Sequence, residues 1–242
     1  MSLPRVRLEG SRREGDSLWI LDQEQGRHLI AVRRCREGDL FEGLLPGKKF
    51  TLRLKISGSE ARGILVSASP EEASPRIWLL AGLLKSEPFD RLVAQSVEAG
   101  ASVIVPLLCS RSVVSVDPSK IGRKMERWHR IILEATKQCG AATPTEIFEP
   151  VEPSAIGSIG LPASRFAAMT SGTSDIFRFR PSQEAAIAVG PEGDWTEEEI
   201  EILGREGFVP VRLGPRIMRS QTAAVVGVAC LSLVTTVDRN DE

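Results

Sequence analysis

The chain has 242 residues, of which 42% are hydrophobic and 26% charged, and its formal net charge is −1. This is the balance of a folded protein with one large core or two smaller ones, and we expect two domains. No segment approaches the roughly 20 consecutive apolar residues of a membrane span. Four scattered cysteines and two histidines offer no cluster of metal ligands. We therefore expect a cytoplasmic protein without a metal or a membrane anchor.

The N-terminal part, residues 1–71, predicts a small β-barrel or sandwich. Short β-like pieces alternate with turn signals such as EGD and PGKK. The expected strands cover residues 5–8, 17–21, 39–45, 50–57 and 61–69. Residues 23–39 break this pattern and suit a short helix or a loop. The first 70 residues carry a net charge of +4 and the rest −5, so the basic end of the chain is the N-terminal one.

After a linker at residues 70–75, strands alternate with helices over residues 74–242. The expected strands cover residues 76–84, 102–108, 165–171, 185–190 and 208–214. The expected helices cover residues 89–101, 120–140, 195–207 and 220–237. This βα alternation predicts an α/β domain with a parallel sheet and helices on both faces.

Three loops follow strands of that sheet, at the edge where open α/β sheets bind ligands. They read TSGTS at 170–174, GPEG at 190–193 and LGPRIMRSQT at 213–222. Pro191 fixes one φ angle, and Thr196 with Glu199 resembles a capping box for the next helix. The turn is therefore predicted to be rigid, with exposed backbone groups. GPEG alone is equally compatible with an ordinary well-capped strand-to-helix turn. Neither GxGxxG nor GxxxxGK[ST] occurs, which disfavours a nucleotide-phosphate cradle.

Longer motifs around these loops resemble a known family. GPEGDWTEEEI, RLGPRIMRSQTAAVVG, WHRIILEATKQCG and LLKSEPFDRLVAQSVEAGASVIVPLLCSRSVV are similar to those of the RsmE-type methyltransferases, which modify N3 of a uridine in 16S rRNA. RHLIAVRRCREGD is similar to the opening signature of that family. The resemblance runs from about residue 5 to 235.

The resemblance implies a SPOUT fold, in which the C-terminal part of a parallel sheet is threaded into a trefoil knot, preceded by a PUA-like barrel that binds RNA. It implies a homodimer and S-adenosylmethionine as cofactor. The cofactor-binding residues carried over by motif are Thr170, Ser171, Gly172, Gly190, Pro191, Glu192, Gly193, Leu213, Gly214, Ile217, Met218, Ser220 and Thr222.

Arg219 is the expected catalytic residue, because a guanidinium can stabilise negative charge that develops on the base. No side chain is an obvious general base, and His129 is read as a surface or packing residue. RNA contacts are expected from basic residues that give affinity without sequence information. They are Arg27, His28, Arg33, Arg34, Lys85, Arg91 and Arg111. For each, a solvated surface residue is the alternative.

The chain departs from the family pattern at four places. Ser96 stands where the pattern has lysine, Ala141 and Ala142 where it has arginine, Gln221 where it has glutamate, and Asp194 where it has glycine. Two alternatives to the uridine-N3 methyltransferase therefore stay open. One is a knotted RNA-binding protein with weak or no activity, and the other is a SPOUT methyltransferase that acts on a different RNA.

Overall fold

The computed structural model describes residues 3–58, 60–71, 74–113, 117–172, 174–179, 181 and 183–237. The chain folds as two compact units. The N-terminal unit consists of Met1–Ala73 with Thr136–Pro144, and the C-terminal unit of Ser74–Ala135 with Thr145–Glu242. This division differs from the expected one, because Thr136–Pro144 belongs to the N-terminal unit. Glu72 and Ala73 of the expected linker and Thr173 of the TSGTS loop lie outside the described residues.

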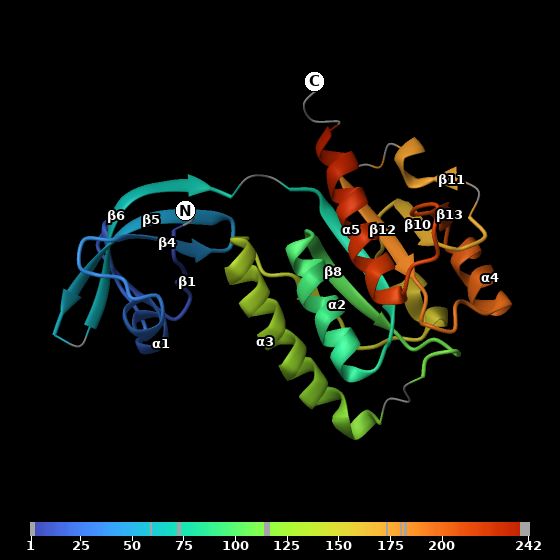
Figure 1. Ribbon diagram of the computed structural model, residues 1–242, viewed down its shortest axis with the longest axis horizontal. Helices are drawn as coiled ribbons and strands as arrows, with labels where there is room; N and C mark the ends of the chain where they lie inside the picture. The colour runs from blue at the N-terminus through green and yellow to red at the C-terminus, as the bar shows by residue number, and fades with distance from the viewer. Residues whose placement is uncertain are drawn as a thin grey trace. The chain divides into compact units, whose positions relative to one another are not determined.

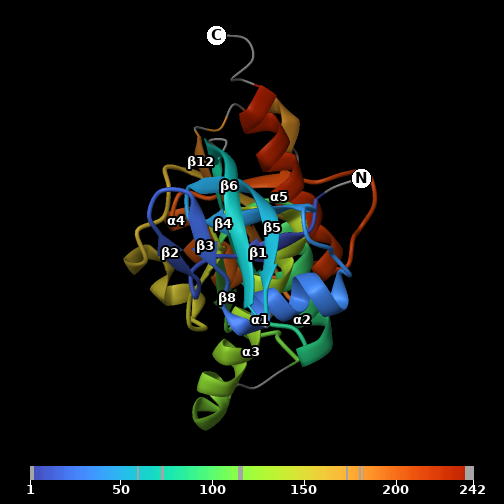
Figure 2. The same cartoon turned by 90° about the vertical axis from the view of Figure 1, so that its left-hand side faces the viewer.

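A six-stranded sheet forms the N-terminal unit, in the order β1-β4-β5-β6-β3-β2 (Figure 2). β1 pairs in parallel with β4, and the other neighbours are antiparallel. Every β-like piece expected here contains a strand, while three-residue β2 gave no signal. The strands are β1 (Arg5–Arg7), β2 (Arg12–Glu14), β3 (Leu18–Ile20), β4 (Leu40–Leu45), β5 (Lys48–Ser57) and β6 (Glu60–Pro70). Side chains from these strands and from the segments that connect them form one core, made of Val6, Leu8, Trp19, Leu21, Leu29, Phe41, Phe50, Leu52, Leu54 and Ala61.

Residues 23–32 are helical and residues 33–39 form a loop that leads into β4, so each of the two structures expected for residues 23–39 is present in part. Asp22 caps α1 (Gln23–Arg27) by accepting a hydrogen bond from the backbone N–H of Gln25 at 2.9 Å. A π-helical turn, η1 (His28–Val32), follows directly. This short helical stretch places Leu29 in the core.

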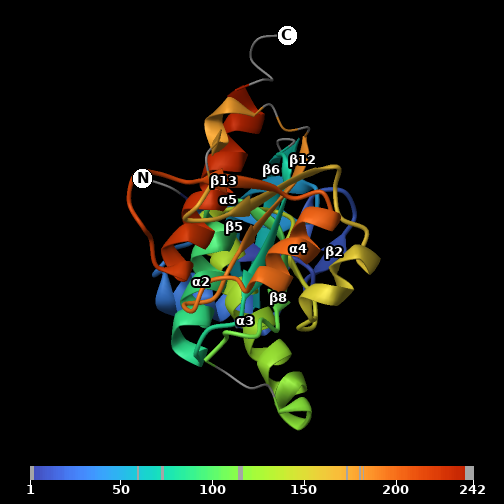
Figure 3. The same cartoon turned by 90° about the vertical axis from the view of Figure 1, so that its right-hand side faces the viewer.

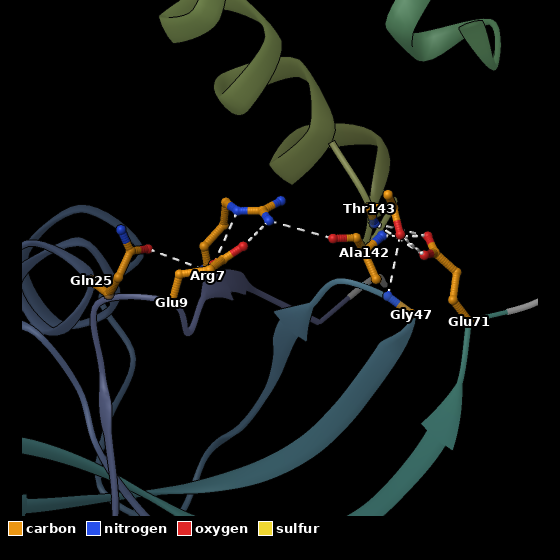
Figure 4. Close-up of polar contacts among 7 residues, drawn as sticks. All are labelled: Arg7, Glu9, Gln25, Gly47, Glu71, Ala142 and Thr143. Carbon is orange, nitrogen blue, oxygen red and sulfur yellow. Dashed lines mark hydrogen bonds and ion pairs between the residues drawn. The ribbon is translucent and has the colours of Figure 1, made fainter. Parts of the chain in front are cut away.

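The segment Thr136–Pro144 is held to the N-terminal unit by polar contacts (Figure 4). The carboxylate of Glu71 accepts hydrogen bonds from the backbone N–H groups of Ala142 and Thr143 and, at 2.7 Å, from the Thr143 hydroxyl. Arg7 donates to the carbonyl of Ala142. Burial acts to raise the pKa of Glu71, but the hydrogen bonds from Thr143 and Ala142 lower it below its ordinary value.

A seven-stranded sheet forms the centre of the C-terminal unit, in the order β11-β13-β10-β12-β7-β8-β9. Every neighbouring pair is parallel, which confirms the expected parallel α/β architecture. The strands are β7 (Arg76–Gly82), β8 (Ala101–Leu107), β9 (Glu146–Ile147), β10 (Ser164–Ala168), β11 (Ser174–Asp175), β12 (Glu184–Val189) and β13 (Val209–Arg212). Parallel strands need crossover connections, and helices supply most of them. The helices are α2 (Ser86–Glu98), α3 (Ile121–Cys139), α4 (Glu197–Arg205) and α5 (Ser220–Val237), with short 3-10 turns η2 (Pro118–Lys120), η3 (Pro153–Ser158) and η4 (Ile176–Arg178).

Helices cover both faces of this sheet (Figures 1 and 3). α5 contacts α2, β12 and β7 on one face. On the other face, Trp78 and Leu80 of β7 pack in one cluster with Leu203 of α4 and Ile156 of η3. Both faces of β7 are therefore buried, which explains its continuous apolar sequence. Among the described residues, no helix combines the length and apolarity needed to cross a bilayer.

Candidate functional site

The three loops singled out in the sequence meet at one edge of the C-terminal sheet. Ala168, at the end of β10, pairs with both Val189 of β12 and Val211 of β13, so these strands end side by side. The loops that follow them surround a cavity of about 730 Å³. Its lining is Leu84, Pro88, Ala168, Met169, Thr170, Val189, Gly190, Pro191, Glu192, Asp194, Arg212, Leu213, Gly214, Pro215, Arg216, Ile217, Met218, Arg219, Ser220, Gln221 and Ala223. A cavity of this size accommodates a ligand as large as a nucleoside derivative.

The GPEG turn forms one wall of this pocket and is packed tightly from behind. A Cβ atom at Gly82, the last residue of β7, would lie 2.6 Å from the backbone nitrogen of Pro191. Only glycine permits so close an approach between the two segments. Asp194 closes the turn, with its N–H donating to the carbonyl of Pro191 at 3.0 Å and a φ of 60°. The turn is therefore fixed by its backbone, and side chains do not fill the pocket in front of it.

Two side chains hold the GPEG turn in place. One is the buried carboxylate of Glu199 in α4, and the other is the guanidinium of Arg111 in the loop after β8. Glu199, only 3% exposed, accepts hydrogen bonds from the N–H of Thr196 at 2.9 Å and the N–H of Ser110 at 2.7 Å. Thr196 accepts in return from the N–H of Glu199, so the predicted capping box is confirmed. Arg111 donates to the carbonyls of Trp195 at 3.0 Å and Gly193 at 3.3 Å. These contacts tie the end of β8 to the pocket wall.

The charged side chains around the pocket are mostly cations. Three guanidinium groups, those of Arg212, Arg216 and Arg219, line it together with the carboxylates of Glu192 and Asp194. Within the described residues, none of the three arginines forms an ion pair. They are therefore available to an anionic group or to negative charge that develops during a reaction.

A family model described as RNA methyltransferase domain matches residues 71–232, well over half of the chain. This chain belongs to the RNA methyltransferase family. The ribosomal RNA small subunit methyltransferase E of Synechocystis sp. is 32% identical over 221 residues, which cover 86% of this chain and 71% of the relative. The resemblance of the sequence to RsmE-type enzymes is thereby confirmed.

Solved structures of similar proteins share the fold over nearly their whole length. A Legionella pneumophila protein, described as a methyltransferase with the bound cofactor SAM, matches with a TM-score of 0.81 and 26% identity over 98% of both chains. The ribosomal RNA small subunit methyltransferase E of Neisseria gonorrhoeae, bound to S-adenosyl methionine, gives a TM-score of 0.83 at 24% identity. It covers 96% of this chain and 98% of its own.

In this RNA methyltransferase, the pocket brings together most of the predicted cofactor-binding residues. Those that line it are Thr170, Gly190, Pro191, Glu192, Leu213, Gly214, Ile217, Met218 and Ser220. Four others lie outside the lining, namely Ser171, Gly172, Gly193 and Thr222. Gly172 and Gly193 pack behind the wall, because added Cβ atoms there would meet the backbone of Val211 and the side chain of Arg111.

Several lining residues were not predicted as site residues. Met169, Asp194, Pro215, Arg216 and Gln221 stand directly beside predicted ones, so the motifs located the loops but not every side chain that faces inward. Leu84 comes from the loop between β7 and α2, and Pro88 from the first turn of α2, and neither was predicted to lie at a binding loop. Their position follows from β7 lying next to β12 in the sheet, a long-range pairing that local patterns do not reveal.

The predicted RNA-binding residues lie at several separate places. In the C-terminal unit, Lys85 precedes α2, Arg91 pairs with Glu87, and Arg111 is engaged with the GPEG turn. None of these three lines the pocket. His129 is exposed on α3, as predicted for a surface residue.

In the N-terminal unit, Arg27, Arg33 and Arg34 are exposed and His28 is half-buried. Burial and the positive charges of Lys137 and Arg33 lower the pKa of His28 below its ordinary value. These surroundings favour the neutral imidazole, which can still form a hydrogen bond.

The departures from the family pattern differ in their surroundings. Ser96 is fully buried in α2. Ala142 is also buried, within the N-terminal unit. Gln221 lines the pocket and donates a hydrogen bond to the side chain of Gln95 at 2.9 Å.

Proposed function

We propose that this chain transfers a methyl group from S-adenosylmethionine to N3 of a uridine in 16S rRNA. The pocket at the carboxyl ends of β10, β12 and β13 carries this proposal, because its loops hold the motifs that resemble RsmE-type enzymes. The match to the RNA methyltransferase family and the bound cofactor of the Legionella relative support it.

The residues that line the pocket suit this cofactor. Backbone N–H and C=O groups of the GPEG and LGPRIMRS loops are proposed to bind the polar groups of the adenosine. The carboxylates of Glu192 and Asp194 suit ribose hydroxyls or a cationic centre. Leu84, Leu213 and Ile217 add apolar surface for the purine ring. Ser171, Gly172, Gly193 and Thr222 are proposed to shape these loops from outside the pocket.

The reaction needs few chemical groups from the protein. The N3–H proton of uracil is lost to water, the N3 lone pair attacks the methyl carbon, and the carbon–sulfur bond breaks to release S-adenosylhomocysteine. Positioning accounts for much of the rate, since the sulfonium is already a strong electrophile. Arg219 is the proposed catalytic residue, because its guanidinium lines the pocket, forms no ion pair with any described residue and can stabilise the uracil anion.

We extend the proposal to the surroundings of the reaction. The N-terminal unit is a PUA-like domain that binds RNA through Arg27, His28, Arg33 and Arg34, while Lys85, Arg91 and Arg111 contact RNA beside the pocket. The last strand of the sheet, β13, lies between β11 and β10, which is consistent with a C-terminal knot. Leu233 of α5, an apolar side chain that is 63% exposed, supports a homodimer. A cytoplasmic location follows from the rRNA substrate.

Incubation with S-adenosylmethionine labelled in its methyl group tests the function. Small ribosomal subunits that lack the modification and a mixture of transfer RNAs serve as separate substrates, and cofactor binding is measured by calorimetry in parallel. We expect label in 16S rRNA alone. Label in transfer RNA would assign the pocket to another substrate, and cofactor binding without any label would indicate an RNA-binding protein that has lost the reaction.

A further inference from the structure

A second cavity, of about 230 Å³, lies between the beginnings of α2 and α3 in the C-terminal unit. The two helices are neighbours (Figure 1). Its lining is Leu84, Ser86, Phe89, Asp90, Lys120, Arg123, Lys124, Arg127 and Trp128. Four of these residues are cations and one is an anion. We call this cavity the α3 groove.

The cations of the α3 groove form one stripe on the helix. Lys120, Arg123, Lys124 and Arg127 are spaced by three, one and three residues, which places them on the same side of α3 and of the turn before it. A stripe of this kind is usually a solvated helix face. The stripe on α3 borders a cavity instead. The base of this cavity is formed by Phe89 and Trp128, which are 1% and 2% exposed and whose ring centroids lie 4.9 Å apart.

Among the residues that the structure describes, two of the four cations have no carboxylate partner. Arg127 pairs with the buried carboxylate of Asp90, which neutralises the only anion of the lining and fixes Arg127 at the rim. Lys120 pairs with Asp117 at 3.3 Å on the exposed side. Lys124 lies over the ring of Trp128, 6.0 Å from its centroid, and Arg123 is exposed. Within the described residues, neither Arg123 nor Lys124 forms an ion pair, so the groove keeps an excess of positive charge.

The α3 groove adjoins the large pocket. Leu84 lines both cavities, and Ser86 of the groove is two residues from Pro88 of the pocket. Because the two cavities share Leu84, an RNA strand whose base enters the large pocket could continue along the α3 groove. Phosphate oxygens are the ligands that unpaired Arg and Lys side chains favour.

We propose that the α3 groove binds the phosphate backbone of the RNA next to the target nucleotide, with Arg123 and Lys124 as its principal contacts. This proposal rests on the proposed function in one respect, since that function supplies RNA as the ligand. The groove positions the strand and does not read its sequence, because contacts to phosphate carry no base information. It adds a contact region to the predicted basic residues, none of which lies in the groove.

The test is the binding of small ribosomal subunits to the Arg123→Gln, Lys124→Gln double variant at several salt concentrations, without S-adenosylmethionine. Arg127 stays unchanged because its removal would leave Asp90 buried without a partner. The matched control, Arg178→Gln with Arg205→Gln, removes two charges from exposed residues that line neither cavity. Calorimetry with S-adenosylmethionine checks that each variant keeps its fold.

We expect the groove variant to bind the subunits about tenfold more weakly, with a salt slope reduced by about 1.4, since each phosphate contact to a single strand contributes about 0.7. The control should bind like the wild type. Equal affinity and equal salt slope for the groove variant and the control would contradict the proposal that the α3 groove binds RNA. A wild type that binds RNA but methylates no uridine would contradict the proposed function alone, whereas a wild type that binds no RNA would overturn both.

Discussion

Glu199 of α4 accepts a hydrogen bond from the backbone N–H of Ser110 at 2.7 Å, across 89 residues of sequence. The same carboxylate completes the capping box at Thr196. One buried side chain therefore holds both the start of α4 and the loop after β8 behind the GPEG turn. The shape of the pocket wall depends on this carboxylate.

Replacement of Glu199 by alanine should weaken both the fold and the pocket. Two backbone N–H groups lose their partner, which costs about 2–3 kcal/mol of unfolding free energy. The loosened turn should also lower the affinity for S-adenosylmethionine, which calorimetry measures. Glu201, an exposed residue of the same helix, gives the control Glu201→Ala. Unchanged stability and affinity in Glu199→Ala would show that the brace is dispensable.

Gly214→Leu should remove cofactor binding and leave the protein folded. A Cβ atom at this position would meet only the terminal methyl of Met218, at 3.2 Å, so the larger side chain has room but occupies the pocket. Thermal unfolding with and without S-adenosylmethionine measures the effect, because a ligand that binds the folded state raises the melting temperature. Gly204→Leu, on the open surface of α4, is the control. If S-adenosylmethionine raises the melting temperature of Gly214→Leu as much as that of the wild type, this loop does not belong to the cofactor site.

Arg219→Ala should lower the rate of methyl transfer by about 100-fold or more, as expected for the loss of a group that stabilises developing charge. The affinity for S-adenosylmethionine should change little, because the proposed partner of this guanidinium is the base. Single-turnover kinetics with saturating subunits separates the two effects. If the rate stays the same while binding weakens, Arg219 is a binding residue and not a catalytic one.

The contacts of Glu71 predict a stability that depends on pH. The folded-state pKa of Glu71 lies below its unfolded value of about 4.5, so the unfolded chain takes up the proton first as the pH falls. The stabilisation is fully present above pH 4.5 and is lost as the pH falls through the folded pKa. At pH 7 the wild type should be more stable than Glu71→Gln by about 1 kcal/mol of unfolding free energy. This value is small because Glu71 is partly exposed and solvent screens its contacts.

Urea unfolding of both proteins from pH 7 to pH 3.5 measures this difference. It should shrink steadily below pH 4.5. A difference that stays constant over this range would mean that the carboxylate is not ionised in its contacts with Ala142 and Thr143.

The regular elements and the three loops were predictable because their signals are local. Alternating apolar residues marked the strands, and Thr196 with Glu199 marked the start of α4. The fold of an open parallel sheet then brings loops at strand ends together, which is why separate motifs converge on one pocket. Two-residue strands such as β9 and β11 are too short to show any alternation.

The remaining features depend on contacts between distant parts of the chain. The attachment of Thr136–Pro144 to the N-terminal unit depends on Glu71 and Arg7, which lie 72 and 135 residues from their partners. The burial of Ser96 was not predicted, although its spacing from Leu92 and Val93 places it on the apolar face of α2. The α3 groove could not be predicted from the sequence either, because it forms only where α2 packs beside α3. Without α2, its basic stripe has the pattern of a solvated helix face.

The chemical identity of the methylated nucleoside tests the central claim most directly. Small subunits that lack the modification are treated with the protein and S-adenosylmethionine, the 16S rRNA is digested to nucleosides, and the products are compared with a 3-methyluridine standard by chromatography and mass spectrometry. We predict one new product, 3-methyluridine, which is absent with the Gly214→Leu variant. A different methylated nucleoside, or none from a protein that binds the cofactor, would contradict the proposed reaction.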